Sequence, residues 1–99
     1  MKKLEVIIPD KASNEVNNIL AQAHVGGVSH YRIDGRGRNT SIFIPETKVE
    51  VVVKDEQVET LISAIVEKLS ANRMIGKIFV VDIPIAVDIA TKKKVESVI

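Results

Sequence analysis

The residues best suited to binding chemistry lie at positions 35–39, which read Gly-Arg-Gly-Arg-Asn and follow the second predicted strand. Glycines allow a backbone to approach a ligand closely, and arginines offer forked donors to phosphate or carboxylate. The segment therefore predicts a loop that handles an anion. Because exposed hairpins often carry the same two residue types, an ordinary turn is the alternative interpretation.

A second glycine-containing junction, Gly76-Lys77, lies where a loop enters the last main strand. A backbone N–H and a lysine ammonium can together hold a phosphate at such a place. It is not a P-loop, because the glycine spacing and the following Ser/Thr and helix are missing. A turn glycine beside a solvated lysine is the alternative, and the basic run at residues 92–94 is typical of a solvated tail.

Residue types that carry catalysis are scattered along the chain. His24 and His30 have no acidic residue at metal-ligand spacing, so we expect no metal site and a structural or surface role for both. Ser29 and Ser41 have no base placed by a recognisable motif, and the G-x-S-x-G elbow is absent. We therefore expect a protein that is not an enzyme.

Length and composition narrow the class of protein. Ninety-nine residues predict one domain, and an aliphatic core is expected because only Tyr31, Phe43 and Phe79 are aromatic. The net charge of +1 provides no global field for nucleic acid or a membrane surface. There is no cysteine, the first residues run directly into a strand pattern, and no apolar run approaches the length of a membrane span. These features favour a cytoplasmic protein.

An internal repeat predicts the fold. Residues 3–10 (KLEVIIPD) resemble residues 48–55 (KVEVVVKD), an offset of 45 (48 minus 3). A helical pattern follows each copy, with apolar positions at Val16, Ile19, Leu20 and Ala23, then at Val58, Leu61, Ile62, Ile65, Val66 and Leu69. Return strands are expected at residues 28–33 and 77–83. The order is βαββαβ, which predicts an α+β, ferredoxin-like sandwich with both helices on one face of a four-stranded antiparallel sheet.

Local signals suggest where these elements begin and end. Asp10 or Ser13 is expected to cap the first helix and Asp55 the second. Gly26-Gly27 is expected to stop the first helix, and Pro84 to end the last main strand. A short extra strand at residues 86–90 is possible, and residues 42–44 either extend the third strand or form an apolar hairpin tip.

The strand runs at residues 6–8, 51–53 and 78–81 are apolar at consecutive positions, so both faces of the sheet carry apolar side chains. Two helices cover only one face, and a large apolar patch rarely stays in water. We therefore expect a homo-oligomer.

Two other functions known for this fold fit the sequence poorly. The central strands lack the aromatic residues on which an RNA-recognition motif stacks bases. Acylphosphatase needs an arginine-bearing glycine loop where this chain has Pro-Asp-Lys at residues 9–11.

The sequence resembles the P-II family of signal-transduction proteins. The segments that carry the resemblance occur in family order: residues 1–8 (MKKLEVII), 25–29 (VGGVS), 35–38 (GRGR), 48–53 (KVEVVV) and 76–80 (GKIFV). The resemblance implies a single P-II-like domain over residues 1–99, assembled as a homotrimer with adenine-nucleotide clefts between neighbours. It also implies regulation of a partner, such as an ammonium transporter or a nitrogen enzyme, without catalysis and without membrane insertion.

The resemblance implies roles for individual residues. Gly35, Gly37 and Arg38 correspond to the base of the T-loop (residues 37–47), beside the nucleotide phosphates. Asn39 stands where the family usually has a glutamine that helps to bind magnesium and 2-oxoglutarate. Gly76 and Lys77 match the end of the phosphate-binding B-loop (residues 71–77). Contacts to the adenine and the cleft wall are implied for Ile7, Gly27, Val28, Ser29, Glu50 and Val52.

The chain also departs from the family pattern. Its T-loop is about a dozen residues shorter and lacks the tyrosine that many members modify. In the C-terminal segment, Asp88 and Ala90 occupy the places of two phosphate-binding arginines, ahead of the tail at residues 91–99. We therefore expect ADP or AMP to bind more readily than ATP, unless Lys92, Lys93 and Lys94 compensate. A structural or adaptor trimer that has lost effector binding is the alternative function.

Overall fold

Strands and helices follow each other in the predicted βαββαβ order, and the computed structural model describes residues 1–94. The last part of the predicted tail, residues 95–99, lies outside the described residues. The elements are β1 (Lys2–Pro9), the 3-10 turn η1 (Asp10–Ala12), α1 (Ser13–Gln22), β2 (Val28–Gly35), β3 (Ile44–Val53), the 3-10 turn η2 (Asp55–Gln57), α2 (Val58–Ala71) and β4 (Lys77–Asp82).

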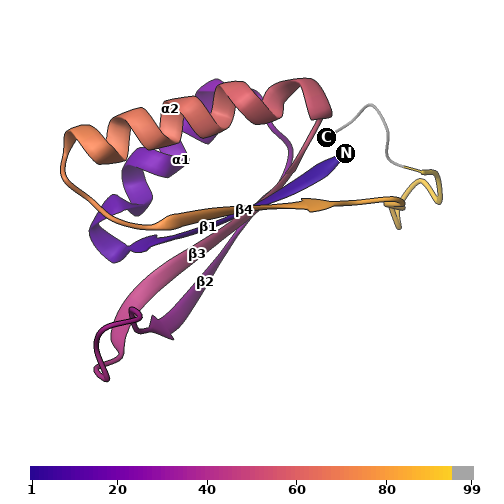
Figure 1. Cartoon of the computed structure of the whole chain (residues 1–99). Coiled ribbons are helices and arrows are strands. Elements are labelled where there is room, and N and C mark those ends of the chain that lie inside the picture. Colours follow the sequence, from indigo (N-terminus) through magenta and orange to yellow (C-terminus); the bar gives the residue numbers. More distant parts are fainter. Residues whose placement is uncertain (95–99) are drawn as a thin grey trace.

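The four strands form one antiparallel sheet in the order β2-β3-β1-β4. Both helices lie on the same side of this sheet (Figure 1). The predicted ferredoxin-like sandwich is therefore confirmed. None of the described helices combines the length and hydropathy that crossing a membrane requires.

Alternation along the two central strands builds the core. Successive side chains of a strand point to opposite faces, so β1 buries Leu4, Val6 and Ile8 beneath the helices. In β3 the buried positions are Val49, Val51 and Val53. The helices complete the core with Val16 and Leu20 from α1 and Leu61, Ile65 and Leu69 from α2. Burying each of these side chains stabilises the fold by about 1.5–3 kcal/mol.

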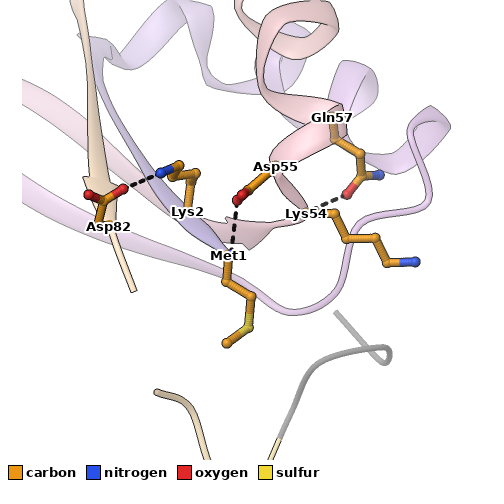
Figure 2. Close-up of polar contacts among 6 residues, drawn as sticks. All are labelled: Met1, Lys2, Lys54, Asp55, Gln57 and Asp82. Carbon is orange, nitrogen blue, oxygen red and sulfur yellow. Dashed lines mark hydrogen bonds and ion pairs between the residues drawn. The ribbon is translucent and has the colours of Figure 1, made fainter. Parts of the chain in front are cut away.

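Two amide side chains join the ends of the helix pair. The Gln57 amide oxygen accepts a hydrogen bond from the Lys54 backbone N–H (3.1 Å; Figure 2), and its nitrogen donates to the Ala23 carbonyl (3.3 Å). At the other end, the Asn72 amide nitrogen donates to Oε2 of Glu15 (3.2 Å). The end of each helix therefore lies against the start of the other, which makes α1 and α2 antiparallel. Neither amide was singled out from the sequence.

The predicted helix caps are wrong, because a 3-10 turn precedes each helix and neither helix has a side-chain cap hydrogen bond. Asp10 instead accepts a hydrogen bond from the Thr47 hydroxyl (2.7 Å) and so joins η1 to β3. Asp55 pairs with the amino group of Met1 (2.9 Å; Figure 2), which lowers the pKa of its carboxyl group. Ser13 begins α1 without capping it.

The predicted glycine stop for the first helix is also wrong. Helix α1 ends at Gln22, and His24 adopts the left-handed conformation with φ 55°. Arg73 does the same after α2, with φ 56°. No glycine among the described residues has a positive φ. Each helix therefore ends on a residue whose β-carbon opposes that conformation.

Strand boundaries differ slightly from those expected. β2 runs on to Gly35, and β4 ends at Asp82, one residue early, although the Ile83 N–H still donates to the Met1 carbonyl (3.1 Å). The extra strand expected at residues 86–90 is not formed. A single bridge joins Val87 to Lys94 and closes a small hairpin beyond β4 (yellow in Figure 1). Of residues 42–44, only Ile44 belongs to β3.

Replacing Arg73 by glycine is expected to stabilise the protein by about 1 kcal/mol, because glycine adopts a positive φ without a steric penalty. Arg73→Ala is the matched control: it removes the same side chain, keeps the β-carbon and is expected to show no gain. Urea unfolding at one fixed protein concentration measures both. Equal stabilities of the two variants would contradict the conformational explanation.

Candidate ligand-binding face of the sheet

Five predicted site residues lie on the face of the sheet that the helices leave uncovered, called here the open face. They are Ile7 in β1, Ser29 in β2, Glu50 and Val52 in β3, and Lys77 in β4. Strand register brings them together in pairs, because Ile7 lies opposite Lys77 and Ser29 lies opposite Glu50. Val28 does not belong to this group: it lies opposite Val51, whose side chain is buried under the helices.

The predicted anion loop is the short connection between β2 and β3, at the lower left of Figure 1. Gly37, Arg38 and Asn39 lie in this loop, and Gly35 is the last residue of β2. Of the predicted T-loop at residues 37–47, positions 44–47 already belong to β3. The loop therefore extends a two-stranded ribbon instead of forming a long excursion.

The two arginines of this loop differ in their surroundings. The Arg36 guanidinium donates to the Thr40 carbonyl (3.0 Å) and lies 5.8 Å from the centre of the Phe43 ring. A further hydrogen bond joins the Ile42 N–H to the Thr40 hydroxyl (3.1 Å). Arg36 thus helps to fold the loop. Within residues 1–94 no hydrogen bond or ion pair involves Arg38, so its guanidinium is the one available to a ligand.

Within one subunit the two glycine-containing segments are far apart. β2 and β4 form opposite edges of the sheet, with β3 and β1 between them. Three interstrand spacings amount to about 14 Å. Arg38 and Lys77 therefore do not form one compact phosphate grip, and a ligand that touches both has to be about as long as a nucleotide.

The close approach of the chain to β1 explains why a glycine is needed at position 76. A β-carbon at this position would lie 2.5 Å from the Ile7 carbonyl oxygen and 3.1 Å from Cγ2 of Ile8. The loop therefore needs a glycine in order to approach β1 and begin β4. Beneath the same junction, between α2 and β4, lies an apolar cavity of about 330 Å³ whose lining includes Val66, Met74 and Ile78. The exposed Lys77 side chain remains the candidate phosphate contact.

A ring of four charges occupies the centre of the open face. The Lys3 ammonium lies 3.0 Å from the Glu5 carboxylate and 3.6 Å from Glu50, while Lys48 lies 3.8 Å from Glu5 and 3.2 Å from Glu50. Glu5 and Glu50 are directly opposite each other in the β1–β3 pair, so each lysine offsets their repulsion. The Lys-x-Glu spacing at residues 3–5 and 48–50 of the repeat could have revealed this charge ring.

The charge ring changes the protonation of its members. Partial burial raises the pKa of Glu50, but hydrogen bonds from Lys48 and Tyr31 and the charge of Lys3 outweigh it, so the pKa lies below its ordinary value. The hydrogen bond to Glu5 raises the pKa of Lys3. Glu50, a predicted adenine contact, is therefore an acceptor-only carboxylate at neutral pH.

Apolar side chains border the charge ring. Tyr31 and Phe79 are each 46% exposed, and Val81 is 40% exposed. They lie beside the ring, because Phe79 is opposite Glu5, Val81 is opposite Lys3 and Tyr31 is opposite Lys48. Exposed aromatic side chains are more frequent at protein interfaces than on the rest of a protein surface, so Tyr31 and Phe79 make this face a candidate contact surface.

Neither histidine belongs to the open-face cluster. Nε2 of His30 lies 2.7 Å from the side-chain oxygen of Asn17, which connects β2 to α1, and His24 lies two residues beyond the end of α1. In the part of the chain that the structure describes, no three His, Cys, Asp or Glu residues converge as a metal site.

The arrangement described above defines a class: a ferredoxin-like α+β domain with an uncovered sheet face and a glycine–arginine hairpin at one edge. The family model of the nitrogen regulatory protein P-II matches residues 1–93, and the chain belongs to this family. A P-II protein of Pasteurella multocida is 33% identical, with both chains covered in full. One from Rhodobacter capsulatus is 36% identical over 92% of this chain and 93% of that protein. P-II 1 of Escherichia coli is 29% identical over the full length of both.

The alignment with the Pasteurella protein also bears on the short loop. It spans 112 positions and includes the whole of this 99-residue chain, so at least 13 positions (112 minus 99) have no residue here. This difference agrees in size with a T-loop that is about a dozen residues short. P-II family proteins form trimers, bind adenine nucleotides and 2-oxoglutarate, and regulate transporters and enzymes.

Gly76→Ala is expected to destabilise the protein by about 1–3 kcal/mol, because the new methyl group meets the β1 backbone, which cannot move aside cheaply. Gly27→Ala is the matched control: nothing lies within 4 Å of the position of its β-carbon, and its stability should stay within about 0.5 kcal/mol of the wild type. Thermal unfolding compares the two. A Gly76→Ala protein as stable as the control would mean that Gly76 is not needed for this close approach.

Glu50→Gln is expected to flatten the acid limb of the stability profile. The folded-state pKa of Glu50 is depressed, so its contribution is complete above the unfolded value of about 4.5 and is lost as the pH falls through the folded value. Unfolding free energies measured between pH 6 and pH 3 test this. Glu59→Gln, on the exposed side of α2, should keep the wild-type profile. Identical acid limbs for wild type and Glu50→Gln would rule out a stabilising charge ring.

Proposed function

We propose that this chain is a non-enzymatic regulator that senses an adenine nucleotide at clefts between the subunits of a homotrimer. The protein then controls a partner in nitrogen metabolism, such as an ammonium transporter or a metabolic enzyme, and acts in the cytoplasm, where P-II proteins generally work. The observation that carries the proposal is the shared placement of Ile7, Ser29, Glu50, Val52 and Lys77 on the open face. These are five of the twelve positions for which the family resemblance implies ligand contacts.

The open face itself supports the trimer. Tyr31 on β2 and Phe79 and Val81 on β4 are 40–46% exposed in the single chain, and exposed aromatic side chains are frequent at interfaces. Covering the face with neighbouring copies buries these side chains and brings two subunits together around a cleft. Because Arg38 and Lys77 do not converge within one subunit, a second subunit can supply the contacts between them.

The C-terminal hairpin supports a preference for ADP or AMP over ATP. The Asp88 carboxylate accepts a hydrogen bond from the Thr91 N–H (3.1 Å), and the Asp88 carbonyl accepts one from the Lys92 N–H (2.8 Å). Asp88 is therefore a turn residue and offers no positive charge where the family has an arginine. Lys92, Lys93 and Lys94 are exposed around the same turn and are the candidates for replacing that charge.

The β2–β3 loop supports contact with a protein partner. Ile42 and Phe43, the last two loop residues before β3, are 68% and 61% exposed, and the Arg36–Thr40 hydrogen bond holds the loop in shape. A preorganised apolar segment loses little conformational entropy on docking. The shortened loop is therefore suited to contacting a partner through a small, preorganised surface.

Two measurements test the proposed function. Light scattering is expected to give about three times the chain mass of 10.9 kDa. Calorimetry should then detect ADP and AMP, with ATP bound no more tightly than ADP, because the phosphate-binding arginines are missing. Arg38→Ala is expected to weaken ADP binding about tenfold, since a charge-assisted contact is lost.

Lys54→Ala is the control for Arg38→Ala, because it removes a cation at the other end of β3 and should leave ADP binding unchanged. A trimer that binds no adenine nucleotide would contradict the sensor and favour the structural or adaptor function. A monomer would exclude clefts between subunits. Micromolar or tighter ATP binding would show that the missing arginines do not matter.

A further inference from the structure

The space beside Gly35 is filled by a side chain of the same subunit. A β-carbon at Gly35 would overlap the carboxylate of Glu46, which reaches across from β3. In the β2–β3 pair, Glu46 of β3 lies opposite Ile33 of β2, and Ile33 is two residues before Gly35 on the same strand. The backbone position expected to lie beside the nucleotide phosphates is therefore already covered by an anion.

This carboxylate carries uncompensated charge. Within residues 1–94 no ion pair or hydrogen bond involves the Glu46 side chain. Arg32, which lines the same shallow cavity of about 290 Å³, has its guanidinium 3.8 Å from the carboxylate of Asp10. Asp34 also lines this cavity, but Arg32 and Asp34 alternate with Ile33 along β2, so their side chains point to the other face of the sheet from Glu46. No cation within residues 1–94 forms an ion pair with Glu46, so its negative charge at the root of the hairpin is not compensated.

We propose that Glu46 determines the specificity of this cleft: its carboxylate occupies the space beside Gly35, and an anionic ligand binds only by displacing or repelling it. The inference rests on the proposed nucleotide cleft and adds a residue that selects against negative charge there. It predicts that the carboxylate of Glu46 lowers the affinity for a ligand more strongly as the negative charge of the ligand increases. The loss of affinity is therefore larger for ADP than for AMP.

The geometry allows displacement without unfolding. The atoms that cover Gly35 are the far end of a flexible glutamate side chain, with its carboxylate foremost. Rotation about its side-chain bonds can move this carboxylate towards solvent while β2 and β3 keep their register. Even after such a movement, the charge stays on the same strand, within a few ångströms of the ligand, where water screens it only in part.

Glu46→Gln tests the role of the charge, because it preserves the size of the side chain and removes the negative charge. Calorimetry with adenosine, AMP and ADP is carried out on the wild type and on this variant. Neutralisation is expected to tighten ADP binding about fivefold to tenfold, to tighten AMP binding less, and to leave adenosine unchanged. Raising the ionic strength should reduce the difference between the two proteins.

Glu59→Gln is the matched control, since it removes one carboxylate from the exposed side of α2 and should leave the affinities unchanged. Circular dichroism and light scattering confirm that Glu46→Gln keeps the fold and the oligomer. Equal ADP affinity for wild type and Glu46→Gln would overturn the inference while leaving the proposed function intact. An equal gain for adenosine would also overturn it, because the effect would then be steric.

Binding of ADP by Glu46→Gln alone would support the inference and show that the wild-type cleft is closed by its own carboxylate. If neither protein binds any of the three compounds, both the inference and the proposed nucleotide cleft are wrong. The two failures are therefore distinguishable from each other.

Discussion

The pairing of β1 with β3 is the constraint on which the rest of the structure depends. Its register places Leu4, Val6, Val49 and Val51 on one face, where the helices bury them, and Lys3, Glu5, Lys48 and Glu50 on the other. A shift of either strand by one residue would turn its two charged side chains under the helices and its buried apolar side chains out to the open face. Hydrophobic burial on one side and charge compensation on the other therefore specify the same register, and this register presents Ile7 and Val52 on the open face.

The helices are held over this strand pair by apolar packing together with two amide contacts. Gln57 bonds to the carbonyl of Ala23 and Asn72 to the carboxylate of Glu15, so each half of the repeat is joined to the other at both ends of the helix pair. The helices consequently cover one face only and leave the other exposed. The open face is therefore exposed because both helices close the core from the same side, and this exposed face is the surface on which the proposed intersubunit cleft depends.

The sequence was sufficient to predict the order of elements, the antiparallel sheet and the core stripe, because these depend on periodicity that survives in any context. The caps could not be predicted, since Asp10 and Asp55 found partners distant in sequence, Thr47 and the Met1 amino group. The positive φ values of His24 and Arg73 could not be predicted either. Glycine is the residue expected at such a position, and Gly26 lies only two residues after His24. The position of the Glu46 carboxylate over Gly35 depends on the register of β2 and β3. The sequence next to Glu46 does not reveal this position.

The hairpin root shows how a shortened loop changes the chemistry of a cleft. With β3 beginning at Ile44, the strand pairing continues to Gly35 and brings Glu46 onto the same ribbon as the glycine–arginine segment. Arg36 is used to fold the loop, which leaves Arg38 as the loop's available cation. The balance of charge at the root therefore shifts from two arginines towards one arginine and one facing carboxylate. In the proposed cleft this balance favours a ligand of low charge, and the exposed Ile42 and Phe43 beside β3 remain free for the proposed contact with a partner.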